Sequence, residues 1–419
     1  MLDMQYVRDN AELVKKATKD KGFDSSVIDE LLSIDEKHRA LIAEVEKIRH
    51  DRNNLNDQLK KNRTEELISQ SRSLKAELDK KEPELDALAQ QVKELALKIP
   101  NPSAADVLVG KEEDNQVVRQ VGKIKDFSFP VRDHLELGML TKTLDLTAGT
   151  KVAQSGFYYV KGMGAMLEFA LVQYALNKLA KHGFTPVITP NVANEHSVVG
   201  CGFQARSDKE RQIYHIDGED LDLIGTAEIT LVGQHQDTTF NASDLPLKYA
   251  GYSYCYRYEK GSYGRDVRGI IRVHEFRKIE MVVFCLPEES DAIHEKLREI
   301  EEEIWTELGV PYQLIKMATG DLGNAASRKY DIEAWMPSQN KYREVTSTSN
   351  TTDFQARRLG IKVRRNGGTE YLHTLNGTAF ALGRAMIAIY ENYQNEDGSI
   401  TIPTVLQPFI GTTVIPVQK

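Results

Sequence analysis

Residues 256–280 read YRYEKGSYGRDVRGIIRVHEFRKIE, two strand-like runs around a loop that holds Gly261, Gly264, Arg265, Asp266, Arg268 and Gly269. Polar and apolar residues alternate in the second run. Because successive side chains of a strand point to opposite faces, one face should carry Arg272, His274, Phe276, Lys278 and Glu280. Alternating charge is also typical of a solvated edge strand, but an aromatic ring in the middle of the polar face favours a binding surface.

The residue types in this stretch suit a nucleotide. A guanidinium such as that of Arg257 or Arg272 meets phosphate oxygens in a fork and keeps its charge. The ring of Phe276 can stack on a purine, and Glu259 can accept from an exocyclic amine. A second carboxylate, Glu280, can hold a substrate ammonium. The residues alone therefore predict a polar strand face that binds a nucleotide.

The surrounding chain predicts an α+β domain on an antiparallel sheet. Strands linked by short turns, with helices segregated between them, are typical of that class. No GxGxxG or GxxxxGK[ST] occurs, so neither a Rossmann nor a P-loop site is supported. We expect helices at 163–182, 288–308 (a charged surface helix) and 385–393, and strands near 185–189, 213–216, 221–224, 248–258, 270–285, 332–335, 341–347 and 370–375, with 213–216 and 221–224 joined as a hairpin.

Residues 27–99 have a different pattern. Leucine and other apolar residues recur every three or four positions, first from Leu31 to Leu59 and then from Leu67 to Ile99. This spacing turns one apolar stripe toward a partner helix. The short break at 61–64 predicts an antiparallel coiled-coil hairpin, with Thr64 as the N-cap of its second helix. Pro83 should kink that helix or remove one of its hydrogen bonds.

A hairpin of this kind commonly serves dimerisation or spacing, but its tip is basic, which favours a phosphate backbone. Asn-Pro at 101–102 marks a linker. We therefore expect an N-terminal domain at 1–102 and a second domain at 103–419. The basic side chains of the tip, which are the candidate residues for contact with a phosphate backbone, are Lys47, Arg49, Arg52, Lys60, Lys61 and Arg63.

The bulk composition excludes several classes of protein. With 41% hydrophobic and 28% charged residues, the 419-residue chain is neither fibrous nor disordered. The net charge of −8 requires any nucleic-acid contact to be local. No apolar run suits a membrane span. Cys201, Cys255 and Cys285 lie far apart, which favours buried thiols in a reducing cytoplasm and gives no zinc ligand set.

Five sequence blocks together resemble the class II aminoacyl-tRNA synthetases, and in detail the bacterial seryl-tRNA synthetase family. Residues 256–280 are similar to motif 2 and residues 226–228 (TAE) to that family's TxE loop. Residues 343–358 resemble its EVSS-containing segment, and residues 375–384 (LNGTAFALGR) resemble motif 3. The helix ending at Gly183 and the strand reaching Pro190 stand where motif 1 would be. The long hairpin extends the resemblance over the whole chain.

The resemblance implies a serine–tRNA ligase reaction, in which serine and ATP form seryl-adenylate and the seryl group passes to tRNA-Ser, or to tRNA-Sec where present. It also implies Mg²⁺, no zinc, and a homodimer through motif 1. The domain at 1–102 would bind tRNA through the basic tip of its hairpin, and the domain at 103–419 would be catalytic. The implied catalytic residues are Arg257, Arg384 and Glu344, with Glu344 and Ser347 as Mg²⁺ ligands. The implied serine-binding residues are Thr226, Ala227, Glu228, Arg257, Glu280, Asn376 and Thr378. The implied ATP-binding residues are Arg257, Tyr258, Glu259, Arg272, Val273, Phe276, Glu344, Val345, Thr346, Ser347 and Arg384.

Three other functions remain open. A synthetase-like ligase could load a carrier protein, although such relatives lack the arm. An inactive paralogue with a binding role would not need the charged residues of motifs 2 and 3. A coiled-coil adaptor would leave the polar strand face unexplained. Gly225, Tyr258 and Thr378 depart from the usual family wording around the serine pocket. For His274 a structural hydrogen bond is expected, because the attacking carboxylate has no proton to lose.

Overall fold

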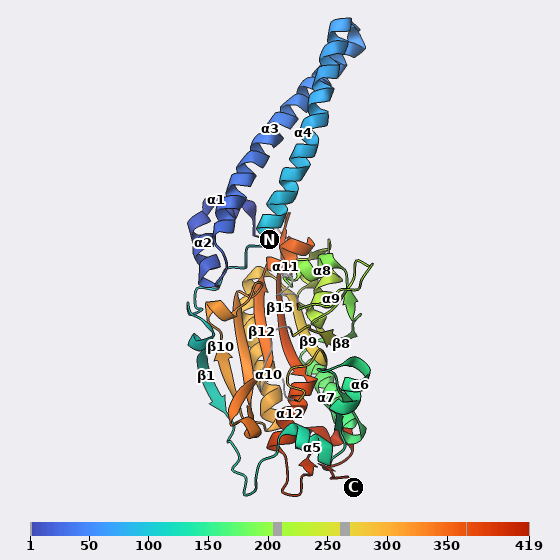
Figure 1. Ribbon diagram of the computed structural model, residues 1–419. Coiled ribbons are helices and arrows are strands. Elements are labelled where there is room, and N and C mark those ends of the chain that lie inside the picture. The colour runs from blue at the N-terminus through green and yellow to red at the C-terminus, as the bar shows by residue number, and fades with distance from the viewer. Residues whose placement is uncertain (1, 204–211, 260–268, 366, 419) are drawn as a thin grey trace. The chain divides into compact units, whose positions relative to one another are not determined.

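A computed structural model describes residues 2–203, 212–259, 269–365 and 367–418 (Figure 1). Contacts divide the chain into two compact units, residues 1–102 and 103–419. The predicted loop residues Gly261, Gly264, Arg265, Asp266 and Arg268 lie outside the described residues.

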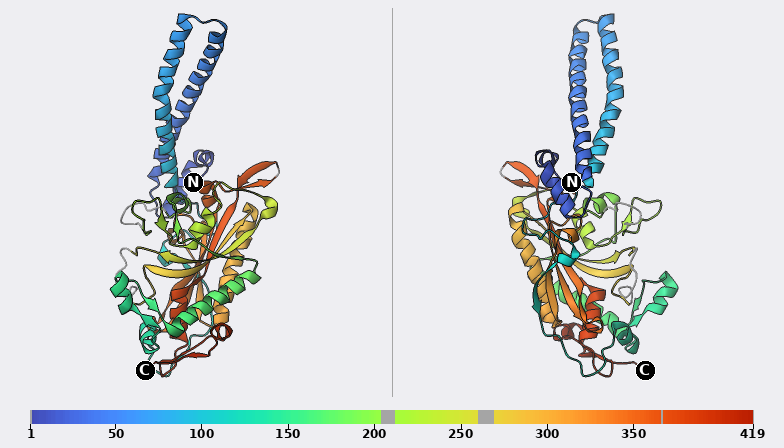
Figure 2. Two further views of the ribbon diagram at one scale, coloured as in Figure 1. Left: turned by 90° about the vertical axis from the view of Figure 1, so that its right-hand side faces the viewer. Right: turned by 60° about the vertical axis from the view of Figure 1, so that its left-hand side comes forward.

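Two long helices dominate the N-terminal unit. After α1 (Met4–Asp9) and α2 (Ala11–Asp20), α3 (Ser26–Lys61) and α4 (Glu65–Leu97) form the expected hairpin, which Figure 2 shows from two further sides. Leu41, Val45, Ile48 and Leu78 form a buried cluster between the two helices. Thr64 caps α4 as predicted, since its hydroxyl accepts from the N–H of Leu67 at 3.3 Å.

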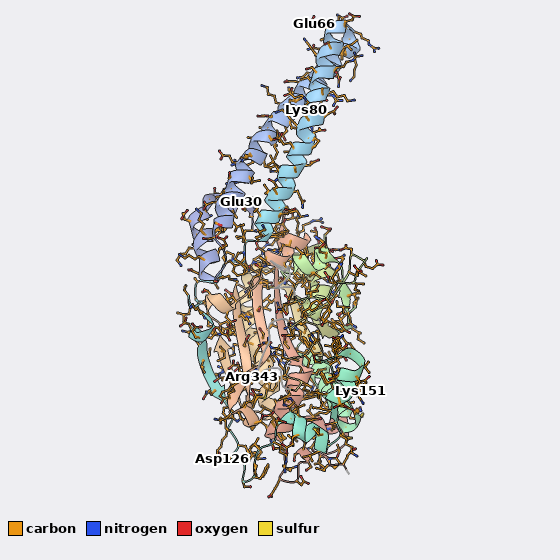
Figure 3. The ribbon with its side chains drawn as sticks, in the orientation of Figure 1. Glu30, Glu66, Lys80, Asp126, Lys151 and Arg343 are labelled. Carbon is orange, nitrogen blue, oxygen red and sulfur yellow. The ribbon has the colours of Figure 1, made fainter. Side chains whose placement is uncertain are left out.

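The proline in α4 does not end the helix. Pro83 lies inside the span Glu65–Leu97, which continues on both sides of it. A proline has no N–H, so the hydrogen bond that residue 83 would donate is missing, as expected. Packing along the hairpin therefore outweighs the loss of one backbone bond. Glu30, Lys80 and Glu66 mark points along the hairpin in Figure 3.

An eight-stranded sheet forms the centre of the second unit. All neighbouring strands are antiparallel except the pair of β4 and β8 at one edge. The fold class predicted from the sequence is confirmed. In spatial order the strands are β1 (Gln116–Val121), β10 (Tyr312–Lys316), β11 (Arg328–Met336), β12 (Lys341–Thr352), β15 (His373–Ala381), β9 (Glu275–Cys285), β8 (Leu247–Tyr256) and β4 (Thr185–Ile188).

The two faces of the sheet carry different residues. On β9, Ile279, Met281 and Val283 belong to the large core that includes residues of α7 (Gly162–Lys181), α10 (Ser290–Leu308) and α12 (Leu382–Asn392). Val282 and Phe284 point the other way, into a smaller core with α8 (Glu195–Gly200), α9 (Ala227–Gly233) and α11 (Phe354–Leu359). Figure 1 shows α10 behind the sheet and α8, α9 and α11 together near one end of it. Both faces are therefore covered at that end.

Shorter elements complete this unit. They are α5 (His134–Leu140), α6 (Leu146–Ala153), α13 (Gln407–Ile410) and the small sheets of β2 (Leu144–Asp145) with β3 (Tyr159–Val160), β5 (Val192–Ala193) with β6 (Asp222–Leu223), β7 (Thr239–Asn241) with β13 (Lys362–Arg365) and β14 (Gly368–Tyr371), and β16 (Ile400–Thr401) with β17 (Val414–Ile415).

Four sequence-based expectations were wrong in detail. The strand expected at 270–285 begins at Glu275, so Arg272 and His274 precede it. The hairpin expected at 213–224 is present but shorter than expected: His215 and Asp222 form an antiparallel bridge, and the N–H groups of Ile216 and Leu223 donate to the carbonyl oxygens of Leu221 and Tyr214. The strand expected at 370–375 is two strands, β14 and β15, separated at residue 372. The helix expected on the surface at 288–308 packs against the sheet, because Trp305 is fully buried.

Two predictions from composition have structural counterparts. The three cysteines are buried and unpaired, as expected for small core residues. Across the part of the chain that the structure describes, no helix has the length and apolar character to cross a membrane.

Candidate active site

A cavity of about 330 Å³ lies on the face of the sheet that carries Phe276, Lys278 and Glu280. Strands β9, β12 and β15 form its floor, and residues 270–273, 322 and 324–326 contribute to its walls. Of the seventeen residues expected to bind serine, ATP or Mg²⁺, fifteen line it: Thr226, Glu228, Arg257, Glu259, Arg272, Val273, Phe276, Glu280, Glu344, Val345, Thr346, Ser347, Asn376, Thr378 and Arg384. The other two, Ala227 and Tyr258, do not line it.

One end of the cavity holds two buried carboxylates. Glu228 follows the N-cap of α9, where the hydroxyl of Thr226 accepts from its N–H at 3.2 Å. The carboxylate of Glu228 accepts from the amide of Gln355 at 2.6 Å and from that of Asn376 at 2.8 Å. The second carboxylate, Glu280, is paired with Lys278.

The environment shifts the protonation of Glu228. Burial, together with the nearby charge of Glu280, raises the pKa of Glu228 to about 7. Thr378 donates its hydroxyl to Glu280 at 3.2 Å and so lies beside the two acids. This end of the cavity presents carboxylates and a hydroxyl to a small ligand, a combination that suits an ammonium and an alcohol.

The other end of the cavity carries cations and one aromatic ring. The guanidinium of Arg257 lies 5.2 Å from the ring centre of Phe276 and donates to the carbonyl oxygen of Gly225 at 3.3 Å. Arg272 forms an ion pair with Glu259 at 3.2 Å. Arginines beside an accessible aromatic ring provide what a nucleotide needs, namely charge for phosphates and a stacking surface for the base.

Arg384 connects this end of the cavity to β12. It stands in the first turn of α12, as expected, and its guanidinium donates to the carbonyl oxygens of Ile271 at 3.3 Å and Glu344 at 3.0 Å. It also pairs with the Glu344 carboxylate at 3.3 Å. Burial alone would raise the pKa of Glu344, but the charges of Arg384 and Lys329 outweigh burial and lower it. The carboxylate is therefore ionised at neutral pH.

Two charged residues on β11 support the same region and were not predicted. Asp331 and Lys329 stand opposite Ser347 and Ser349 in the register of β11 and β12. Ser347 hydrogen-bonds to Asp331, and the ammonium of Lys329 lies 3.4 Å from that carboxylate. Lys329 also lines the cavity. Only the cross-strand register brings these residues together, so no linear motif could have identified them.

Some predicted residues have a structural role. Tyr258 stacks on Tyr214 with ring centres 3.9 Å apart. The Nδ1 atom of His274 lies 3.0 Å from the Tyr214 hydroxyl and 3.1 Å from the carbonyl oxygen of Arg257. His274 thus makes the structural hydrogen bonds expected of it. Ala227 is the first residue of α9 and is fully buried.

Comparison with known proteins agrees with this geometry. Residues 1–103 match the family model of the seryl-tRNA synthetase N-terminal domain, and residues 212–393 match that of the tRNA synthetase class II core domain (G, H, P, S and T). The chain is 45% identical to a serine–tRNA ligase from Rubrobacter xylanophilus over 421 residues, which is 99% of each protein. The chain belongs to the seryl-tRNA synthetase family.

Solved structures of the seryl-tRNA synthetase family match the entire fold. The chain superposes on seryl-tRNA synthetase from Pyrococcus horikoshii complexed with ATP with a TM-score of 0.93, at 38% identity and over 100% of both chains. It matches the cytoplasmic serine-tRNA ligase from Naegleria fowleri in complex with AMP with a TM-score of 0.86, at 31% identity and over 99% and 97% of the two chains.

The candidate tRNA-binding residues of this seryl-tRNA synthetase family member lie on α3 and on the turn that follows it. Lys47, Lys61 and Arg63 are exposed. Arg49 pairs with Glu82 of α4 at 2.8 Å, and Lys60 pairs with Asp57 at 2.8 Å. Pairs at such exposed positions are weak and exchange readily with another anion.

Proposed function

We propose that this chain activates L-serine with ATP to seryl-adenylate and transfers the seryl group to tRNA. Membership of the family, together with a cavity that has carboxylates at one end and arginines at the other, supports this reaction. In-line attack of a carboxylate on the α-phosphorus needs positioning and charge neutralisation more than a protein nucleophile. The carboxylates of the cavity would position serine, and its arginines would neutralise the charge of the phosphates.

The carboxylate end is proposed to bind serine. Glu228 and Glu280 would receive the substrate ammonium, and Thr378 would lie near its hydroxyl. A site that hydrogen-bonds this hydroxyl leaves its own polar groups unpaired when alanine binds, and so selects serine. Asn376 and Gln355 hold Glu228 in place through its Oε1 atom.

The arginine end is proposed to bind ATP. Phe276 would stack on the adenine, and Glu259 would accept from its amino group. Arg257 would hold the α-phosphate where the serine carboxylate attacks it, while Arg272 and Arg384 would neutralise the outgoing pyrophosphate. Arg272 and Arg384 are paired with Glu259 and Glu344, so ATP would exchange these carboxylate partners for phosphates.

The oxygen ligands of Mg²⁺ fit two neighbouring residues of β12. Glu344 is ionised, and Ser347 can direct its hydroxyl hydrogen to Asp331, which leaves its oxygen lone pairs for a hard cation. Among the described residues no group of three or more His, Cys, Asp or Glu side chains is placed to hold a metal ion. We infer that Mg²⁺ would be shared with the ATP phosphates, whose charge it would neutralise.

The arm and one edge of the sheet are proposed to bind macromolecules. The basic residues at the tip of the hairpin would contact the backbone of tRNA-Ser.

A second copy of the chain would cover the exposed apolar residues of motif 1, which are Met166 and Phe169 on α7 and Ile188 on β4. Ile188 is 86% exposed on an edge strand, which is unusual for a large apolar side chain unless a partner covers it.

ATP–pyrophosphate exchange with serine, threonine, alanine and glycine tests the proposed reaction. We expect exchange with serine and a large loss of it in Arg257→Ala, because this guanidinium lies between the TAE loop, which it contacts at Gly225, and the ring of Phe276. Arg364→Ala is the matched control, since Arg364 is exposed and lies outside the cavity. Near-normal exchange in a folded Arg257→Ala protein would contradict the assignment of the site.

The carrier-protein alternative differs from this proposal in its acceptor. The long hairpin favours tRNA, because its exposed basic tip suits a polyanionic backbone. Charging assays with tRNA-Ser and with a purified acyl or peptidyl carrier protein would separate the two acceptors.

A further inference from the structure

A buried imidazole connects α12 to the segment that leads into β9. His134 is the first residue of α5 and is 4% exposed, and Glu391 on α12 is fully buried. The two helices lie side by side at the lower end of the sheet in Figure 1. Neither residue lines the cavity, so their contacts act on it only through other residues.

The hydrogen bonds fix the tautomer of His134. The backbone N–H of Ile270 points at Nε2 of His134 at 3.3 Å, and because a backbone N–H can only donate, Nε2 carries no proton. The proton of the neutral ring then sits on Nδ1, which donates to Glu391 at 3.1 Å. Glu391 also accepts from the N–H groups of His134 at 3.3 Å and Ser338 at 3.0 Å. The carboxylate is thus fixed from two sides.

The backbone segment that His134 contacts at Ile270 lines the arginine end of the cavity, where ATP is proposed to bind. Ile270, Ile271 and Arg272 line the cavity, and the carbonyl oxygen of Ile271 accepts from Arg384. Residues 269–274 are not part of a strand, so no ladder of hydrogen bonds holds them. Their backbone is held instead at Ile270 by His134 and at His274, whose N–H donates to the carbonyl oxygen of Gly156 at 3.0 Å.

Gly269 permits this close approach. Its φ is +83°, and a Cβ atom built there would overlap the imidazole of His134 at Nε2. A side chain at 269 would therefore push the imidazole away as well as strain the backbone. The contact depends on the absence of a side chain at this position.

We propose that Glu391 and His134 are positioning residues for ATP, which hold Ile270 and Ile271 so that Arg272 and Arg384 face the phosphates. This inference rests on the proposed function and deepens it. The serine end is carried by α9, β9 and β15, which make no hydrogen bond to His134 among those described. Loss of the contact should therefore impair ATP binding and leave serine binding intact.

Two substitutions of His134 separate positioning from general stability. In His134→Gln the side-chain oxygen can reach the Nε2 position and accept from Ile270. In His134→Asn the amide can take the Nδ1 position and donate to Glu391, but it is too short to reach Ile270. We expect His134→Asn to raise the KM for ATP in pyrophosphate exchange about tenfold, from loss of one buried hydrogen bond, with the KM for serine nearly unchanged. His134→Gln should restore most of the affinity for ATP.

A purely structural role predicts a different result. Both variants would then lose thermal stability with no selective change in the KM for ATP, and this outcome would overturn the inference. Gly269→Ala should displace the His134 imidazole from Ile270, and it should raise the KM for ATP with the KM for serine nearly unchanged. If the parent protein itself lacks serine-dependent exchange, the proposed function fails.

Hydrogen exchange of the parent protein tests the contact without any variant. The amide of Ile270 should be protected in the nucleotide-free protein to a degree similar to amides of β9, although it lies outside any strand. Rapid exchange at Ile270 would contradict the proposal even if the protein charges tRNA normally.

Discussion

In residues 103–419, the charge and hydrogen bonding of single side chains depend on neighbours that are distant in sequence. The linear motifs identified residues that the structure brings to one cavity, because arginines, carboxylates and a ring in motif 2 can be identified by residue type. Lys329, which lines the cavity, was missed, as were Asp331 and Gln355, which contact the lining residues Lys329 and Glu228, since only strand register and helix packing bring them there. Tyr258 stacks its ring on Tyr214, a contact that no local pattern indicates.

Glu301 on α10 is a buried acid whose protonation affects stability. It is fully buried and accepts from the hydroxyl of Thr346 at 3.2 Å, while its Oε1 atom has no hydrogen-bond partner among the described residues. Burial raises the pKa of Glu301 well above its ordinary value of 4.5. A raised folded-state pKa means that its contribution to stability is complete below the unfolded pKa and is lost as pH rises.

Glu301→Gln should therefore become more stable relative to the parent protein as pH increases. The difference should grow above pH 4.5 by up to about 1.4 kcal/mol per pH unit, the limit for one proton. Urea denaturation at pH 5.5 and pH 8 measures the change. Glu299→Gln, on the exposed side of the same helix, is the control, and equal pH profiles for the two variants would contradict the assignment.

At the scale of elements, the helical hairpin and most strands of the central sheet follow from patterns that the sequence shows clearly, whereas β1 and β10 were not expected. The start of β9 does not, because alternation continues through residues 270–274 although their backbone bonds go elsewhere. The N–H of Ile270 bonds to His134, and that of His274 to Gly156. Alternating polarity shows which side chains share a face but not which backbone groups pair, so the end of a strand cannot be found from alternation alone.

The tip of the hairpin is expected to bind RNA through charge. Lys60, Lys61 and Arg63 changed together to alanine should weaken tRNA binding and reduce the magnitude of its log–log salt slope by roughly 2 to 3, about one per phosphate contact. The change removes contacts to a backbone and should leave pyrophosphate exchange intact.

A matched triple variant controls for net charge. Arg72, Lys75 and Lys80 are exposed on α4 and carry the same total charge, and Figure 3 labels Lys80 part-way along the hairpin. Their change to alanine should affect the salt slope less. Equal effects of the two triples would show that general charge, and not the tip, attracts the tRNA.

Motif 1 is expected to mediate dimerisation. Phe169, 63% exposed on α7, should lie in the interface, so Phe169→Glu should shift the protein toward monomer in sedimentation velocity. A buried unpaired charge in an apolar interface costs several kcal/mol. Val117→Glu on β1, at the opposite edge of the sheet, is the control and should leave the assembly unchanged.

At the scale of the whole molecule, the two units are proposed to have different roles, with both chemical steps in the cavity and tRNA contact at the hairpin. The described residues that line the cavity all lie in 103–419, and the hairpin lies in 1–102. The division into a helical arm and a sheet domain was apparent in the sequence because the two parts have different periodicities.

Removal of residues 35–95 should therefore separate the activation of serine from the charging of tRNA. Serine-dependent pyrophosphate exchange should persist, because the deleted segment contributes nothing to the cavity. Charging of tRNA-Ser should fall severely, since the proposed contacts between the basic residues of the hairpin tip and the tRNA backbone are lost. Undiminished charging by the shortened protein would refute the proposed role of the arm.

In the proposed serine site, the carboxyl group of Glu228 should couple the binding of serine to the release of protons into the buffer. With a pKa of about 7 before serine binds, the group is about half protonated at neutral pH. An arriving ammonium favours the ionised form, so binding should expel a fraction of a proton, and serine affinity should rise as pH increases through 7. Calorimetry in buffers of different ionisation enthalpy would measure this release, and an unchanged serine affinity between pH 6 and pH 8 would contradict it.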